Sequence, residues 1–148
     1  MLRTDELTKQ QHIDLMKAYR EVAPTCMKQE EAWRKTNAHP APRYYITPRQ
    51  AWDRMRRMAV GDFEKVDKMK PARKRMFYSL FGRLNEMSQR TEFIGCSLWF
   101  ICQFLVLEPA PEFFLSNDAV KKIFLNTKKY GPDFRYYKIK KQRDRSSD

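Results

Sequence analysis

Apolar residues recur every three or four positions over residues 4–22, 27–35 and 72–87, as they do on the buried face of a surface helix. Helix-breaking signals bound two of these stretches, with Ala23-Pro24 after the first and Pro71 before the third. Glycine and valine are scarce, and long alternating runs are absent. The pattern predicts a mainly all-α fold, with a single helical domain over residues 1–131 and a basic tail over residues 132–148.

Residues 93–107 differ because they are apolar on almost every side of a helix. A membrane span needs roughly 20 apolar residues, and this stretch is shorter and ends at Glu108-Pro109. We therefore expect a central buried helix, with Thr91 as its cap, around which the rest of the domain packs. A membrane-spanning segment is the alternative.

One sequence motif occurs twice in the chain, as PAPRYYIT at residues 40–47 and as PAPEFFLS at residues 109–116. The two copies are offset by 69 residues. A helical pattern follows each copy, with Thr47 and Ser116 placed as N-caps. The two units, residues 39–61 and 108–131, each contain an extended segment and a helix, which is too little to bury an apolar face alone. We expect them to cover each other about a pseudo-twofold axis, with a short two-stranded ribbon as an option for the extended segments.

The aromatic pairs of the repeat have two interpretations. Tyr44-Tyr45 and Phe113-Phe114 are able to stack on unpaired bases, but they stand between a proline bend and a helix cap, where side chains close a core. We favour the core for both pairs. Tyr136-Tyr137 is the better stacking candidate, because it lies among basic residues of the tail.

The net charge is +12, from 30 basic and 18 acidic residues. An excess of this kind attracts polyanions, and phosphate contacts gain from counterion release. The alternative is that the charges lie on solvated helix faces that keep the protein soluble. A helix-turn-helix with its reading helix from Thr91 onward is disfavoured, because that helix lacks polar side chains for base edges. The candidate nucleic-acid-binding residues are Arg49, Arg54, Arg56, Arg57, Lys70, Arg73, Lys74, Arg75, Arg135, Tyr136, Tyr137, Lys138, Lys140 and Lys141.

Residues suited to catalysis are few. His12 and His39 lie in different predicted elements without an acidic or cysteine partner at recognisable spacing, and no Gly-rich phosphate loop or nucleophile elbow occurs. Cys26, Cys96 and Cys102 lack metal-ligand spacing, and we expect buried, reduced thiols. The sequence therefore predicts no enzyme, no metal, no cofactor and no small-molecule substrate.

The doubled motif Pro-Ala-Pro-x-aromatic-aromatic-[Ile/Val/Leu]-[Thr/Ser], followed by a basic helix, resembles short uncharacterised proteins of gut bacteria and their phages. The resemblance covers residues 21–131 and implies a protein of a mobile element or a virion. No apolar leader precedes the first predicted helix, so we expect a location in the bacterial cytoplasm or the virion.

Two functional hypotheses follow. The leading one is a small basic protein that binds nucleic acid, either DNA or RNA, non-specifically through phosphate contacts. The alternative is a structural or interaction protein, such as a phage virion component, that binds a protein partner or its own copies.

Overall fold

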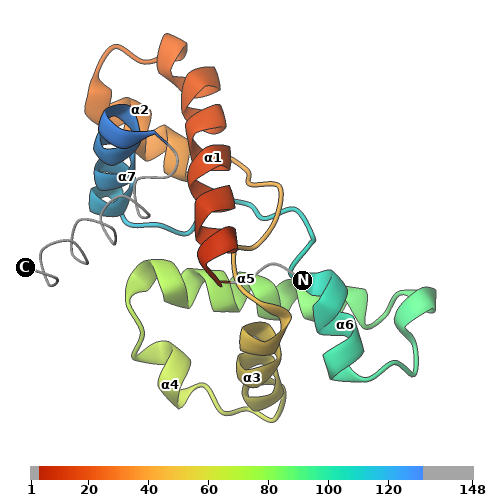
Figure 1. The fold of residues 1–148 in the computed structure, drawn as a ribbon. Coiled ribbons are helices and arrows are strands. Elements are labelled where there is room, and N and C mark those ends of the chain that lie inside the picture. Colours follow the sequence, from red (N-terminus) through yellow and green to blue (C-terminus); the bar gives the residue numbers. More distant parts are fainter. Residues whose placement is uncertain (1–3, 132–148) are drawn as a thin grey trace, which may run out of the picture.

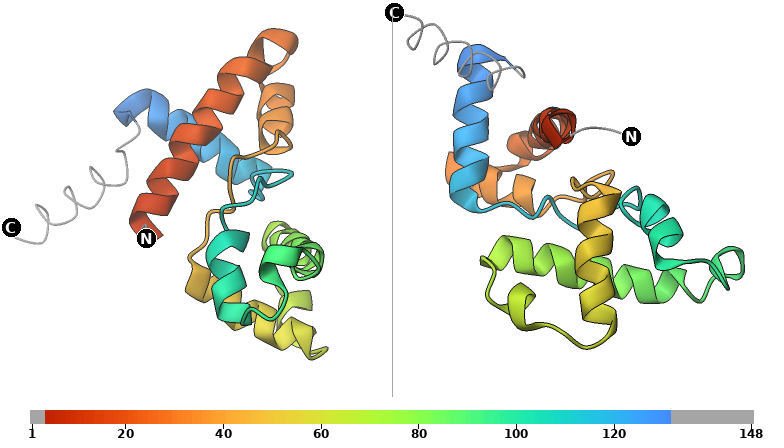
Figure 2. Two further views of the ribbon diagram at one scale, coloured as in Figure 1. Left: turned by 90° about the vertical axis from the view of Figure 1, so that its right-hand side faces the viewer. Right: turned by 60° about the horizontal axis from the view of Figure 1, so that its bottom comes forward.

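The structure is a computed structural model that describes residues 4–131, and within that range the fold is all-α, as predicted. The described helices form two groups that lie side by side (Figures 1 and 2), one of α1, α2 and α7 and the other of α3, α5 and α6. Their bounds are α1 Thr4–Val22, α2 Gln29–Asn37, α3 Pro48–Ala59, α4 Glu64–Asp67, α5 Pro71–Met87, α6 Leu98–Leu105 and α7 Asn117–Tyr130, with 3-10 turns at Ala23–Thr25 and Thr91–Phe93.

The 69-residue offset of the repeated motif also relates the helices on either side of it. It relates α1 to α5, α2 to α6 and α3 to α7, and it superposes the start of α2 at Gln29 on the start of α6 at Leu98. Buried residues of one copy fall on buried residues of the other. These pairs are Leu7 and Met76, Leu15 and Leu84, Ala18 and Met87, Ala32 and Ile101, and Ala51 and Val120. The described chain is therefore a duplicated three-helix unit, larger than the extended-segment-plus-helix unit visible in the sequence.

The two copies exchange their third helices. The third helix of the first copy, α3, packs against α5 and α6, whereas α7 packs against α1 and α2. The short helix α4 lies in the connection between the two copies and packs on α5. Val66 of α4 is fully buried. Because the third helix of each copy packs on the other copy, the buried residues of both copies form one hydrophobic cluster.

The exchange occurs where the two extended segments cross. Ala41 and Ala110 form an isolated antiparallel bridge, each N–H donating to the other residue's carbonyl oxygen at 2.9 Å. Two more backbone hydrogen bonds flank it, from Tyr44 to the Val106 carbonyl and from Phe113 to the Asn37 carbonyl, both 3.0 Å. All four bonds map onto one another under the offset, which agrees with a pseudo-twofold relation. Because the pairing is a single bridge, no two-stranded ribbon forms among the described residues.

The helices that follow the crossing begin where the sequence predicts. Thr47 accepts a hydrogen bond from the Gln50 N–H at 3.1 Å, and the Gln50 side chain accepts one from the Thr47 N–H at 3.0 Å, which together form a capping box. Pro48 occupies the first helical position, where its missing N–H costs nothing. Ser116 caps α7 through the Ala119 N–H at 3.1 Å.

The expectation of a central buried helix over residues 93–107 is wrong. Thr91 begins a 3-10 turn rather than capping a helix, Gly95 adopts a φ of +80° that ends the turn, and Ser97 caps α6. Only one side of α6 is buried, through Ile101, Cys102 and Leu105. The opposite side is exposed, so the centre of the protein is formed by the crossing segments instead.

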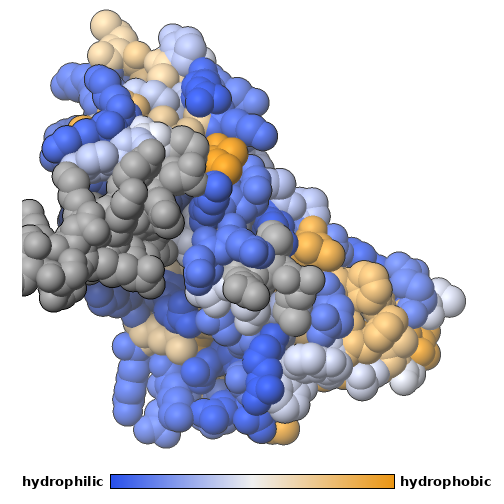
Figure 3. All heavy atoms as spheres, in the orientation of Figure 1, coloured by the Kyte–Doolittle hydropathy of each residue, from blue (hydrophilic) through white to orange (hydrophobic). Residues whose placement is uncertain are grey.

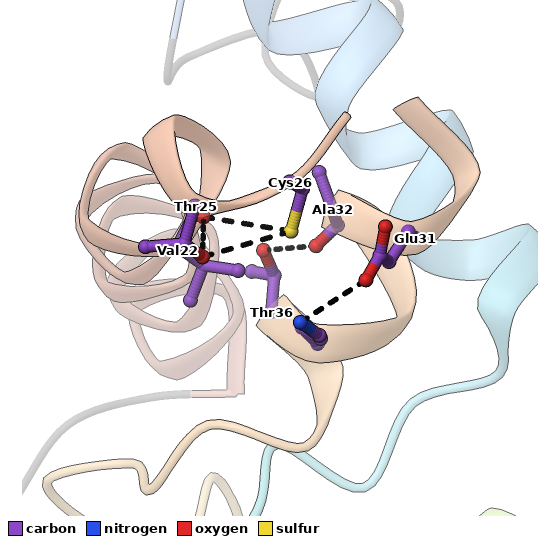
Figure 4. Close-up of polar contacts among 7 residues, drawn as sticks. Val22, Thr25, Cys26, Glu31, Ala32 and Thr36 are labelled. Carbon is purple, nitrogen blue, oxygen red and sulfur yellow. Dashed lines mark hydrogen bonds and ion pairs between the residues drawn. The ribbon is translucent and has the colours of Figure 1, made fainter. Parts of the chain in front are cut away.

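The corner between α1 and α2 explains the position of the first cysteine (Figure 4). Thr25 Oγ1 donates to the Val22 carbonyl at 2.7 Å and Cys26 Sγ lies 3.6 Å from the same oxygen, while Thr36 Oγ1 donates to the Ala32 carbonyl at 2.6 Å. These bonds satisfy carbonyl groups at the end of α1 and within α2. Cys26 is thus half-buried at a helix end and is not a core residue.

The cysteines differ in accessibility, which corrects the expectation that all three are buried. All are free thiols, but only Cys102 is buried, whereas Cys26 and Cys96 are half-buried. Burial raises the pKa of Cys102 to about 11. We expect native protein at about pH 8 to take up a thiol reagent at Cys26 and Cys96 and to acquire the third adduct only in denaturant. Intact-mass spectrometry measures this, and equal native labelling of Cys102 would contradict its placement.

Candidate nucleic-acid interface

The arginines of α3 lie on two different sides of the helix. Arg49 and Arg56 share one side with Trp52, and their guanidinium carbons lie 6.0 and 4.8 Å from the centre of its ring. Both also lie near Asp53, at 3.9 and 3.6 Å between nitrogen and oxygen. Their charge is therefore partly neutralised within the helix. Arg54 lies on another side, toward α5.

Arg54 and Arg73 come together over one buried ring at the contact between α3 and α5. Their guanidinium carbons lie 5.9 and 5.1 Å from the centre of the Phe77 ring, so the two groups are no more than about 11 Å apart. Phe77 is buried. The packing of α3 on α5 thus brings arginines from two helices against the same ring.

An open pocket of about 460 Å³ adjoins this place. Lys70, Arg73 and Arg75 line it from the start of α5, and Ser116 and Asn117 line it from the start of α7. Two helix N-termini therefore border the same cavity, and each contributes partial positive charge from its unpaired N–H groups. Because the basic side chains of Lys70 and Arg73 add to this field, the pocket has the electrostatics of an anion site.

The eight described candidates separate by their ion pairs. Lys74 pairs with Asp67 at 3.7 Å and Arg75 with Glu112 at 3.0 Å, in addition to the two arginines beside Asp53. Among the carboxylates of residues 4–131, none lies within 4.0 Å of the other four basic side chains, which are Arg54, Arg57, Lys70 and Arg73. Three of these four are at the α3–α5 contact or the adjoining pocket, and no contact of the Arg57 side chain ties it to them.

The remaining sequence candidates lie outside the described residues. These are Arg135, Tyr136, Tyr137, Lys138, Lys140 and Lys141. What the sequence did not indicate is the start of α7 as one wall of the pocket, together with Asn37 at its edge. The Ser116 cap was visible in the sequence, but its approach to the start of α5 is a consequence of the helix exchange.

The aromatic pairs of the repeat belong to the core, as the sequence favoured. Tyr44 stacks on Phe114 and Tyr45 on Phe113, with ring centres 5.9 and 6.0 Å apart. The Tyr45 hydroxyl donates to Asp14 at 2.6 Å, and burial together with this hydrogen bond raises the pKa of Tyr45 above its ordinary value. These rings are engaged with one another and do not form a base-stacking platform.

The two histidines lie in different places in the fold. His39, which has no acidic partner at a recognisable sequence spacing, has its Nε2 atom 3.2 Å from Glu21 at the end of α1. His12 is buried in α1, so the two histidines do not share a site. Within residues 4–131, no three side chains of the His, Cys, Asp or Glu type gather as metal ligands. The chemistry that the described geometry carries best is anion binding.

None of the described helices has the length and apolar character needed to cross a membrane. No protein-family model, curated protein or solved structure matches this chain.

Proposed function

We propose that this protein, of a phage or mobile element, binds nucleic acid non-specifically through its phosphates, and that the contact site is the junction of α3, α5 and the start of α7. The observation that carries the proposal is the convergence of Arg54 and Arg73 on the Phe77 ring, with no described carboxylate beside either guanidinium. Lys70 and two helix N-termini extend the positive field into the adjoining pocket. Each phosphate neutralised there releases counterions, which favours binding at low salt.

The paired residues are assigned a smaller part in binding. A phosphate that contacts Arg49 or Arg56 competes with the carboxylate of Asp53, which lies within 4 Å of both. In the same way, Arg75 is already occupied by Glu112. The proposed site therefore contains fewer residues than the full set of basic candidates from the sequence.

The proposed contacts are to the sugar-phosphate backbone of the nucleic acid, and the bases are not read. Base edges are read by polar side chains that a helix or ribbon carries into a groove. The basic residues at the proposed site are arginine and lysine, and they lie at a helix junction. Their side chains are suited to donating hydrogen bonds to phosphate oxygens. The reading helix of a helix-turn-helix would be α6, and its exposed face is apolar. Sequence preference is thus expected to be weak.

The double substitution Arg54→Ala, Arg73→Ala tests the site. We expect it to lower the affinity for duplex DNA or RNA by about tenfold or more and to reduce the salt slope by about two, because two phosphate contacts are lost. The matched control is Arg49→Ala, Arg56→Ala, which removes the same charge from the Asp53-paired side and is expected to change affinity by less than about threefold. Fluorescence anisotropy at several salt concentrations measures both. Equal losses in the two variants would mean that net charge alone binds the polyanion.

A second candidate function is supported by a separate observation. The exposed apolar side of α6 is unlike a solvated surface and suits a structural or interaction protein, such as a virion component. This alternative concerns a different face of the protein, so it is compatible with phosphate binding at the α3–α5 junction.

A further inference from the structure

The exposed side of α6 forms a continuous apolar surface, which we name the α6 face. Figure 3 shows hydrophobic residues gathered over α6 and the connection from α5. Phe100 and Phe104 lie one helical turn apart with ring centres 5.2 Å apart, and Phe104 also contacts Phe93 at 5.6 Å. The members of the α6 face and their exposed fractions are Ile94 68%, Trp99 42%, Phe100 46%, Phe104 45% and Leu107 56%.

The internal duplication allows the exposed residues of the α6 face to be compared with the residues at the equivalent positions of α2. The 69-residue offset places Trp99, Phe100 and Phe104 of α6 on Glu30, Glu31 and Lys35 of α2. On α2 these positions are charged, and Lys35 pairs with Glu31 at 3.1 Å. Ile94 and Leu107 correspond to Thr25 and Ala38, which are both exposed. The fold therefore does not require apolar residues at these positions, and their presence on α6 points to a partner.

The charges at the two ends of the α6 face are opposite. At the N-terminal end of α6, Trp99 meets Trp52 edge-on at 5.5 Å, and Arg49 and Arg56 flank that ring. With Asp53, these residues carry a net charge of about +1. At the other end are Glu92, beside Phe93, and Glu108, which pairs with Arg90 at 2.8 Å. This end carries a net charge of about −1.

This arrangement is self-complementary. No charged residue occurs between Leu98 and Leu105, so two positively charged copies approach one another there without like charges in contact. A twofold axis through the α6 face sets the two α6 helices antiparallel and brings Arg49 and Arg56 of one copy toward Glu92 and Glu108 of the other. A second copy of the chain therefore fits both the apolar surface and its rim.

The size of the α6 face is suitable for this partner. Its exposed side chains present roughly 500 Å² of apolar surface, which is at the upper end of the largest patch found on monomers. A standard interface buries about 800 Å² on each partner, of which about two-thirds is apolar at the core. The α6 face supplies that core, and its charged rim supplies the remainder.

We propose that the protein forms a twofold dimer through the α6 face. The test variant is Phe100→Glu, Phe104→Lys, which transplants onto α6 the ion pair that α2 carries at the equivalent positions. This pair is compatible with the helical unit, so the variant is expected to fold, with helicity and melting temperature as the check. Sedimentation equilibrium from about 1 to 200 µM should give twice the mass of 17.9 kDa for the original chain and a dissociation constant at least about 100-fold weaker for the variant.

The matched control is Leu125→Glu, which places a charge on an exposed leucine of α7 outside the α6 face and should leave the dimer intact. The orientation is tested by charge exchange: Arg56→Glu and Glu92→Arg should each weaken the dimer, and together they should restore it. A monomer at all concentrations overturns the proposal, as does equal dissociation by Leu125→Glu. Monomeric protein that instead pellets with vesicles of anionic and zwitterionic lipid would assign the α6 face to a membrane surface, which also overturns the dimer.

Discussion

Tyr44→Ala should lower the free energy of unfolding by about 3–5 kcal/mol, because it empties the centre of the crossing segments. The Tyr44 side chain is 1% exposed, its ring stacks on Phe114, and its hydroxyl forms a 2.7 Å hydrogen bond with Ser79. The ring lies where the two three-helix copies meet, so its removal leaves a cavity between them. Urea denaturation followed by circular dichroism measures the change.

Two further substitutions separate the causes of that loss. Tyr44→Phe retains the ring and removes only the hydroxyl, so it should cost about 1 kcal/mol. Phe113→Ala removes the residue that the internal repeat places at the same position, and its loss should match that of Tyr44→Ala within about 1 kcal/mol. Met27→Ala, at a side chain that is almost fully exposed, should have little effect. If Phe113→Ala cost much less, the two halves of the crossing would not be energetically equivalent.

The sequence allowed part of the duplication to be found, and the reason is physical. Residues at the crossing must bend, bridge and stack, so both copies retain proline, alanine and aromatic residues in the same order. The helices before the crossing need only bury an apolar side chain, which Leu7 and Met76 do equally well. Identity is therefore lost there while the fold remains, and the three-helix unit became visible only in the structure.

The error at α6 has a related cause. A helix that is apolar all round is usually buried within its own chain, and the sequence pattern does not say which molecule covers it. Phe100 and Phe104 satisfy the pattern of a central helix, yet they lie on the surface. Which side of α6 is buried depends on the helices that pack against it. The equivalent positions of α2 carry charged residues, which shows that the fold does not require apolar residues on the exposed side.

The candidate site could be predicted only as far as local spacing reaches. The ion pairs of Arg49 and Arg56 with Asp53 follow from helical spacing within α3. The meeting of Arg54 with Arg73 depends on the packing of α3 against α5, and the pairing of Arg75 with Glu112 depends on the crossing. The sequence therefore gives the basic residues as candidates without separating the paired from the unpaired ones.

Asn37 is a buried polar residue that joins α2 to the second crossing segment. Its side chain donates to the Leu115 carbonyl and accepts from the Leu115 N–H at 3.0 Å. The neighbouring Phe114 has a φ of +56°, a left-handed conformation that is unfavourable for an aromatic residue. Asn37 therefore holds a strained segment in place. The repeat has Val106 at the equivalent position, so this contact is present in one copy only.

Asn37→Ala should cost about 2–4 kcal/mol in unfolding free energy, because both backbone groups of Leu115 lose their partner. Asn37→Asp gives a sharper test. The ionised carboxylate still accepts from the Leu115 N–H but repels the Leu115 carbonyl, whereas the protonated acid donates to that carbonyl. The folded state thus favours the protonated form and raises its pKa above the unfolded value. The defect should therefore be large at neutral pH, shrink as pH falls through the raised folded-state pKa, and be smallest below the unfolded pKa of about 4. Asn85→Asp, at an exposed position of α5, should show no such acid rescue relative to the original chain. A pH-independent defect in Asn37→Asp would contradict the two-way hydrogen bond.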